Sequence, residues 1–165
     1  MRIYWIDELE KGKIGMMARP RGNDWLEDEI KKLSFRNVDI LVSLLEIKEI
    51  KELELDDEQL LCEKYHLQFL HFPIPDRNIP EDKKAFLELL TFLTSQIQLD
   101  KKIVIHCRMG IGRTSILVAA ILLVLGFKLE TLFELIGKKR TLIVPDTEKQ
   151  IEYIRELSKR INEIH

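Results

Sequence analysis

The chain has little cysteine, glycine or proline, and few aromatic residues. Its 165 residues include 2 Cys, 7 Gly and 5 Pro, and aromatic residues make up 7% of the total. Two cysteines without metal-ligand spacing exclude a disulfide framework and a cysteine-based metal centre, and they favour a reducing compartment. We expect Cys62 to be a core residue, which leaves Cys107 as the cysteine available for chemistry.

Long apolar runs are absent as well. The longest, residues 116–127, is too short for a transmembrane helix, which needs about 20 apolar residues, and it predicts a buried helix. Acidic residues stand too early, at Asp7 and Glu8, for a signal peptide. We therefore expect a cytoplasmic protein with no membrane partner.

The charge is nearly balanced. A net charge of −2, with scattered Lys and Arg, excludes a general polyanion binder, so we expect no nucleic-acid partner. The densest charged block, residues 46–58, alternates in sign and predicts a solvated helix with its loops. The length fits one domain, residues 1–165, which we expect to be a monomer.

Apolar patterns of strand and helix alternate along the chain, with no repeat or linker between them. Because such alternation favours parallel pairing, we expect an α/β fold with a mainly parallel central sheet and helices on both faces. The ligand-binding loops should then gather at the C-terminal ends of the strands. Strands are expected at residues 2–6, 14–17, 38–44, 67–72 and 103–105, and helices at 24–32, 56–64, 80–99, 116–125, 129–139 and 147–164.

The most informative segment runs from Val104 to Ser115 and reads VIHCRMGIGRTS. It places Cys107 and Arg113 at opposite ends of a glycine-bearing turn between an apolar strand and an apolar helix. The backbone N–H groups of this turn can surround one tetrahedral dianion, and the helix N-terminus adds its positive end. These partial charges, with Arg113 and His106, should favour the thiolate form of Cys107. A planar guanidinium can also bind two phosphoryl oxygens at once.

The alternative interpretation is a buried cysteine at a strand end and an unrelated surface arginine. Given a cysteine, however, the surrounding pattern should arise by chance only about once in a million, from average residue usage. The segment resembles the H-C-x-x-G-x-x-R-[ST] signature of cysteine-dependent protein tyrosine phosphatases, in particular the compact dual-specificity group. The resemblance implies that family's fold, with Cys107 as nucleophile, His106 in a supporting role and substrate bound by the six loop residues Arg108, Met109, Gly110, Ile111, Gly112 and Arg113.

A phosphatase of this kind also needs an acid to protonate the leaving oxygen. Asp76 lies in the proline-bounded loop PIPDRNIP, about thirty residues before Cys107, where compact members of the resembled family carry their acid. Pro-Asp is also common in plain turns. Glu81 and Asp82 are rival acids, but after Pro80 they fit the first turn of a helix.

Hydrolysis of a cysteinyl phosphate calls for two further groups. By resemblance, the hydroxyl of Thr114 hydrogen-bonds the departing thiolate, although Thr also suits a helix start. The segment PDTEKQ, residues 145–150, resembles the stretch in which relatives carry a water-orienting glutamine, here Gln150. An exposed helix-start residue is the alternative for Gln150. Arg140 could contact a substrate anion or neutralise a helix C-terminus.

The sequence therefore predicts a hydrolase that needs no metal or other cofactor, because backbone dipoles and Arg113 already offset the phosphoryl charge. We expect a phosphoprotein or phosphopeptide substrate, with phosphotyrosine first and phosphoserine and phosphothreonine also possible. The alternatives are a phosphoinositide or inositol-polyphosphate phosphatase, and, in another class, a phosphate-binding interaction module. The sequence of the loop favours phosphoprotein substrates. Relatives that act on phosphoinositides often carry two lysines in this loop, and RNA-type relatives carry an asparagine at the position of Gly112. A rhodanese-like sulfur transferase would leave Asp76 unexplained.

Overall fold

A computed structural model describes residues 1–164 of the chain, and the burial of side chains up to residue 161. Five strands form one sheet in the order β1-β2-β5-β3-β4. β1 is antiparallel to β2, and all other neighbours are parallel. The strands are β1 (Tyr4–Ile6), β2 (Lys13–Ala18), β3 (Ile40–Ser43), β4 (Gln68–His71) and β5 (Lys102–Cys107).

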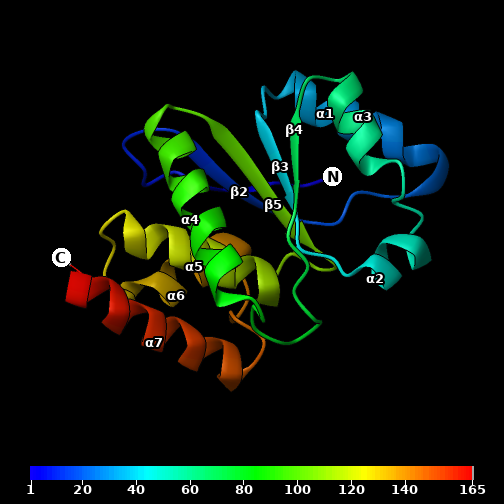
Figure 1. Cartoon of the computed structure of the whole chain (residues 1–165). Helices are drawn as coiled ribbons and strands as arrows, with labels where there is room; N and C mark the ends of the chain where they lie inside the picture. The colour runs from blue at the N-terminus through cyan, green and yellow to red at the C-terminus, as the bar shows by residue number, and fades with distance from the viewer. Residues whose placement is uncertain (165) are drawn as a thin grey trace.

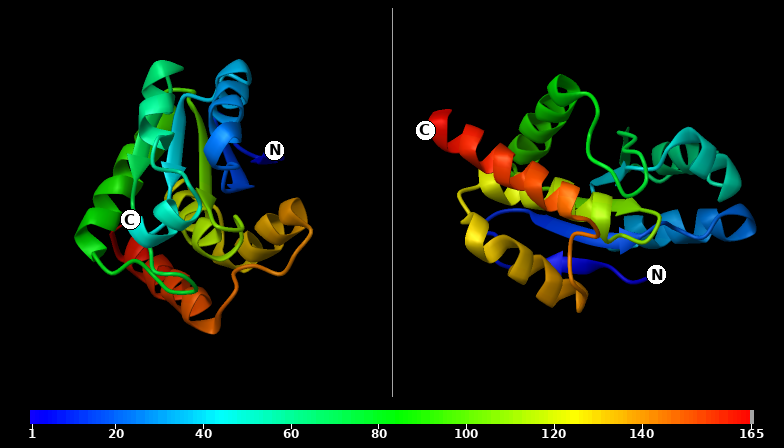
Figure 2. Two further views of the ribbon diagram at one scale, coloured as in Figure 1. Left: turned by 90° about the vertical axis from the view of Figure 1, so that its right-hand side faces the viewer. Right: turned by 90° about the horizontal axis from the view of Figure 1, so that it is seen from below.

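Seven α-helices and a short 3-10 helix are found among the described residues, and they cover both faces of the sheet (Figures 1 and 2). The predicted mainly parallel α/β sandwich is thus confirmed. None of these helices is both long and apolar enough to cross a membrane. The helices are η1 (Asn23–Trp25), α1 (Leu26–Phe35), α2 (Ile47–Glu52), α3 (Glu58–Lys64), α4 (Lys83–Gln98), α5 (Gly112–Val124), α6 (Leu129–Arg140) and α7 (Glu148–Ile164).

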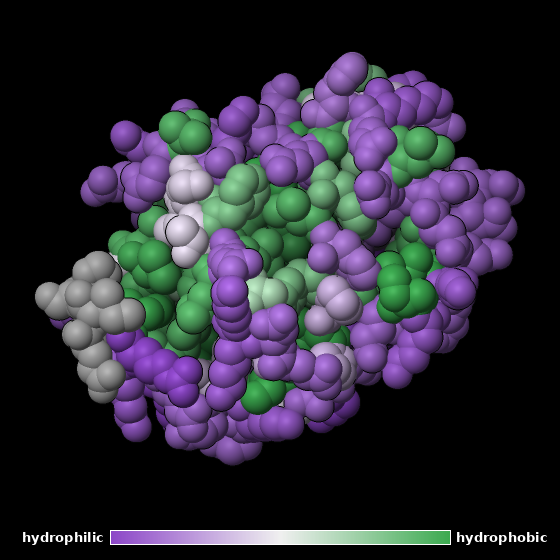
Figure 3. Space-filling view, in the orientation of Figure 1, coloured by the Kyte–Doolittle hydropathy of each residue, from purple (hydrophilic) through white to green (hydrophobic). Residues whose placement is uncertain are grey.

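The sheet separates two apolar cores. Alternate residues of β5 point to opposite faces: Val104 joins the cluster under α1 and α3, whereas Ile103, Ile105 and Cys107 join the cluster that α4, α5 and α6 complete. Strand β5 is central and β2 and β3 flank it, so it is buried along most of its length. Figure 3 shows the outer surface over α4 and β4, where hydrophilic residues surround an apolar area.

Three predicted helix starts are wrong, one of them that of α5, which begins at Gly112 rather than at residue 116. Residue Asp24 lies in η1, and α1 begins at Leu26 without a side-chain cap. The long helix does not begin at Pro80: α4 starts at Lys83, and Asp82 is its N-cap, with a carboxylate that accepts the Ala85 N–H at 2.9 Å. An aspartate satisfies a free N–H at the helix start, which proline cannot do, so the helix begins after Asp82.

Candidate active site

Cys107 ends β5 at the C-terminal edge of the parallel strands, and the loop after it leads directly into α5. The side chain is 3% exposed, and its Sγ accepts a hydrogen bond from the Gly110 N–H at 3.2 Å. Gly110 has φ +67°, and a Cβ there would lie 2.2 Å from the Met17 carbonyl oxygen. Only glycine allows the loop to curl back so closely over the sulfur.

Arg113 lies in the first turn of α5, with a side chain that is 2% exposed. Its Nη1 donates to Glu49 Oε2 at 2.6 Å and to the Ile74 carbonyl at 3.1 Å, and its Nη2 donates to Glu49 Oε1 at 2.9 Å. Burial by itself would lower the pKa of Arg113, but the hydrogen bonds and charge of Glu49, together with the charges of Cys107 and Asp76, offset this and raise the pKa. The guanidinium is therefore a fixed cation with a fixed orientation.

Glu49 of α2 is the residue that holds the arginines in place, and the sequence did not single it out. Besides Arg113, it accepts the Glu46 N–H at 3.0 Å and contacts Nε of Arg108 at 3.4 Å. The prediction that residues 46–58 form a solvated segment is wrong here, because Glu49 is 4% exposed. Burial would raise the pKa of Glu49, but the hydrogen bonds from Arg113 and the Glu46 amide bring it below its ordinary value of 4.5.

Asp76 follows β4 on the loop that leads to α4. Its Oδ1 lies 3.0 Å from Nη2 of Arg113 and accepts the Arg77 N–H at 3.0 Å. Unlike Glu49, this carboxylate is 58% exposed. The structure thus brings the candidate acid to the arginine, whereas the rival Asp82 is used as the cap of α4.

The loop, the arginine and the acid surround one cavity. Its volume is about 200 Å³, enough for a phosphoryl group and part of its ester. Asp146, which sequence reasoning passed over, also borders it: a Cβ on Gly112 would lie 2.3 Å from Asp146 Oδ2. The lining residues are Asp76, Arg77, Cys107, Arg108, Met109, Ile111, Gly112, Arg113 and Asp146.

Thr114 and Gln150 are both fully buried beside this cavity. The Thr114 hydroxyl has no hydrogen-bond partner within residues 1–161. Both ends of the Gln150 amide are engaged: Nε2 donates to the Asn78 carbonyl at 3.0 Å, and Oε1 accepts the Asp146 N–H at 3.1 Å. Gln150 therefore links the acid loop to the start of α7.

Arg140 supports the loop from outside it. Arg140 is 6% exposed, lies 4.0 Å over the Tyr4 ring and donates to the Met109 carbonyl at 3.0 Å. Cys62 is fully buried, as expected of a core residue, and burial raises the pKa of its thiol. Over the described part of the chain, no three His, Cys, Asp or Glu side chains gather as metal ligands would.

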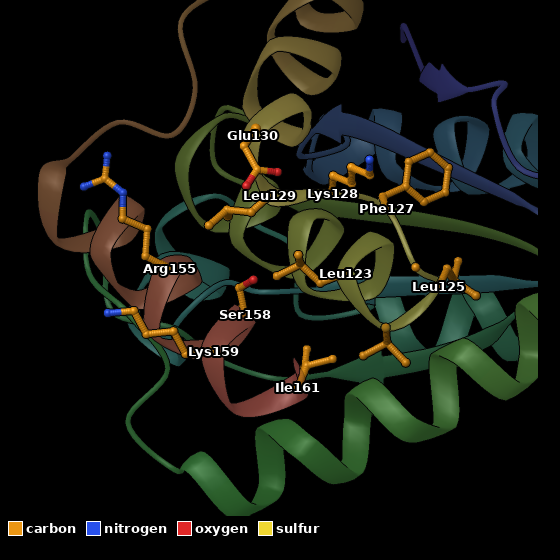
Figure 4. A pocket seen from close by; sticks show the side chains of 12 residues that line it. Leu123, Leu125, Phe127, Lys128, Leu129, Glu130, Arg155, Ser158, Lys159 and Ile161 are labelled. Atoms are coloured by element: carbon orange, nitrogen blue, oxygen red, sulfur yellow. The ribbon is translucent and has the colours of Figure 1, made fainter. Parts of the chain in front are cut away.

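A larger cavity, of about 950 Å³, lies elsewhere (Figure 4). It is formed by the last residues of α5, the start of α6 and the α7 residues Arg155, Ser158, Lys159 and Ile161. Cys107 precedes the opposite end of α5, which is 13 residues long, or about 20 Å at 1.5 Å per residue. The larger cavity has no cysteine in its lining, whereas the small one contains Cys107 with Arg113 and Asp76, so the small one is the candidate active site.

Comparison with known proteins agrees with this geometry. A family described as "Polymorphic toxin system, DSP-PTPase phosphatase" matches residues 14–127, which include both Asp76 and the Cys107 loop. The chain belongs to this phosphatase family. Dual specificity protein phosphatase 4 of Gallus gallus is 27% identical over 82 residues, a match that covers 49% of this chain and 22% of the chicken protein.

Solved structures share the fold over nearly the whole chain. Kinase associated phosphatase, with its catalytic cysteine replaced by serine, superposes with a TM-score of 0.87 at 19% identity, covering 98% of this chain and 96% of that chain. Tk-PTP in its active form superposes with a TM-score of 0.76 at 27% identity, covering 97% of this chain and 99% of that chain. PTPMT1 in complex with PI(5)P superposes with a TM-score of 0.79 at 20% identity, covering 98% of each chain. The chain spans about a fifth of the length of the curated relative that it matches, and what the family match shows is membership of a DSP-PTPase phosphatase family.

Proposed function

We propose that residues 1–165 form a single phosphatase domain that hydrolyses phosphotyrosine in proteins, with phosphoserine and phosphothreonine as further substrates, through a cysteinyl-phosphate intermediate. One observation carries the proposal: the Cys107 sulfur, the Arg113 guanidinium and the Asp76 carboxylate line the same small cavity. Nucleophile, anion-binding fork and acid are the three parts that a metal-free phosphoryl transfer requires.

In the first step, the Cys107 thiolate attacks phosphorus and the P–O bond to the leaving group breaks. The loop amides and Arg113 bind the equatorial oxygens, and Asp76 donates its proton to the leaving oxygen. The exposed position of Asp76, at the mouth of the cavity, suits a group that must reach a large leaving group. Fixed dipoles and a fixed cation stabilise the transition state because they need no reorganisation during the reaction.

In the second step, water attacks phosphorus, Asp76 takes up its proton and the P–S bond breaks. The free hydroxyl of Thr114 is suited to hydrogen-bond the departing thiolate. Gln150 serves this step by holding the acid loop, through the Asn78 carbonyl, next to Asp146 at the edge of the cavity. We propose that water is oriented between these groups.

The charge of the cavity supports proteins over inositol polyphosphates as substrates. Arg108 is already paired with Glu52 at 2.8 Å and with Glu49 at 3.4 Å, and no lysine lines the cavity. Asp76 and Asp146 add negative charge at the edge. One dianion is therefore well bound by the loop and Arg113, whereas an additional phosphate would meet the carboxylates of Asp76 and Asp146, with Arg77 as the remaining lining cation.

Phosphoinositide hydrolysis is the second candidate, because the PTPMT1 structure with PI(5)P has the same fold. For the cell, we propose a monomer in the cytoplasm, without a nucleic-acid or membrane partner. Two cysteines that form no disulfide fit a reducing compartment.

The test measures kcat/KM, with a metal chelator present, on matched phosphotyrosine and phosphothreonine peptides and on an inositol polyphosphate. We expect the phosphotyrosine peptide to be preferred, Cys107→Ser to abolish turnover while still binding phosphate, and acid quenching of the wild type to trap a phosphate on Cys107. A preference for the inositol polyphosphate would overturn the proposal of a phosphoprotein substrate. Substantial turnover by Cys107→Ser would overturn the covalent mechanism.

A further inference from the structure

The larger cavity, between α5, α6 and α7, has no part in the proposed reaction but has the size of a ligand site. Its volume of about 950 Å³ lies near the upper end of the range for small-molecule sites, roughly 300–1,000 Å³. Leu123 at the end of α5, Phe127 before α6 and Ile161 of α7 give it an apolar lining (Figure 4). The cavity can therefore hold the apolar body of an organic molecule.

Ser158 of α7 adds a hydroxyl to this apolar lining. The residue is 7% exposed, and its side chain points from α7 into the cavity (Figure 4). Within residues 1–161 its hydroxyl makes no hydrogen bond, whereas the hydroxyls of Thr91 and Ser95 on α4 bond to carbonyls of their own helix. A buried hydroxyl without a partner is costly. A ligand in the cavity would provide the partner.

The first turn of α6 borders the same cavity. This helix has 12 residues, and its N-cap, Lys128, makes no side-chain capping bond. The first two helical residues, Leu129 and Glu130, line the cavity. The first N–H groups of a helix have no acceptor within the helix, and they carry its positive end. An anionic group is the ligand that such N–H groups bind.

The charged side chains of the lining favour an anion with a single charge. Lys128 and Lys159 are exposed cations of the lining, and Glu130 is its carboxylate. Arg155 also lines the cavity, but it is already paired with two carboxylates of α7. The lining thus has a small positive surplus. A carboxylate can be balanced by this surplus, whereas a phosphate dianion would exceed it.

We propose that the cavity between α5, α6 and α7 binds an organic carboxylate with an apolar body. The carboxylate accepts hydrogen bonds from the Ser158 hydroxyl and from the first N–H groups of α6, and the apolar body lies against Leu123, Phe127 and Ile161. The length of α5 separates this site from the Cys107 cavity. The inference therefore goes beyond the proposed function and does not depend on it.

The test is isothermal titration calorimetry of the full chain with octanoate. Inorganic phosphate is present throughout to occupy the anion-binding loop at Cys107. We expect octanoate to bind with one site per chain, and neutral 1-octanol to bind at least about tenfold more weakly, because it lacks the charge that the hydroxyl and the helix N–H groups recognise.

Two variants and a matched control locate the site. Ser158→Ala suits a helix and should weaken octanoate binding roughly tenfold, since one hydrogen bond to a charged group is lost. Lys159→Gln should weaken it about two- to fivefold, as expected of an exposed charge. Lys149→Gln makes the same change at an exposed position of α7 outside the cavity, and it should leave the affinity unchanged.

Absence of saturable octanoate binding would overturn the inference, and so would unchanged affinity in Ser158→Ala. Equal affinity for 1-octanol would mean an apolar site that does not recognise an anion. A second measurement needs no substitution: octanoate should shift the backbone amide NMR signals of Leu129 and Glu130 most, whereas shifts confined to residues 107–113 would contradict the proposed site. Neither experiment involves turnover, so a negative result leaves the proposed function intact.

Discussion

Arg113 contacts two carboxylates that differ in burial. The difference indicates which of them orients the arginine and which can take part in proton transfer. Glu49 comes from α2, has a side chain that is 5% exposed and holds the guanidinium with both oxygens. Asp76 comes from a loop, is 58% exposed and contacts the same guanidinium with one oxygen. The same type of side chain thus meets the same cation in two environments.

The environments suit opposite tasks. The buried carboxylate keeps its charge, since its pKa lies below the ordinary value, and it cannot exchange protons with a substrate from behind the arginine. The exposed carboxylate lies at the mouth of the cavity, where it can reach a leaving oxygen. We infer that Glu49 orients Arg113 and that Asp76 transfers the proton.

The strongest test of this division removes the group that the two carboxylates share. Arg113→Lys keeps the charge but loses the planar fork, so kcat/KM should fall by roughly 10²–10³. If Glu49 acts only through Arg113, then adding Glu49→Gln to Arg113→Lys should cost little more, although Glu49→Gln alone lowers kcat/KM clearly. A double-mutant cycle of kcat/KM measures this coupling. Additive effects would contradict the assignment of Glu49 as a support.

The next test separates the two carboxylates by leaving group. Asp76→Asn should lower kcat by roughly 10²–10⁴ for an alkyl phosphate, which needs protonation, and much less for p-nitrophenyl phosphate, which does not. Glu49→Gln should lower both rates by the same factor, since it affects binding of the phosphoryl group common to both. Asp82→Asn is the control, because this acid caps α4 and asparagine caps equally well. Equal losses for both substrates in Asp76→Asn would place the acid elsewhere.

The sequence predicted the parts of this site that lie within one local segment. The Cys107 loop is specified by consecutive residues, and the glycine at φ +67° is needed by its own turn. Asp76 was found because it follows a recognisable strand in a proline-bounded loop. The alternation of strands and helices was likewise enough for a mainly parallel sheet.

The supporting acids could not be predicted in this way. Glu49 and Glu58 lie in a block of mixed charge that is typical of a solvated helix. Their burial places them beside Arg113 and His106, which come more than forty residues later in the chain. Asp146 reaches the cavity only because the segment before α7 crosses Gly112. Whether a charged side chain is buried depends on the residue that it pairs with, and that residue lies outside the local sequence pattern.

The smallest expected effect concerns stability and pH. The folded pKa of Glu49 lies below its ordinary value of 4.5, so its ion pair contributes stability above about pH 4.5, and this is lost as pH falls through the folded pKa. At pH 7, Glu49→Gln should lower the free energy of unfolding by about 1–3 kcal/mol, because the buried guanidinium loses a charged partner. The difference from the wild type should shrink toward pH 3, where Glu49 becomes protonated. Urea unfolding at several pH values measures it, and a difference independent of pH would mean that Glu49 stabilises the fold by packing rather than by its charge.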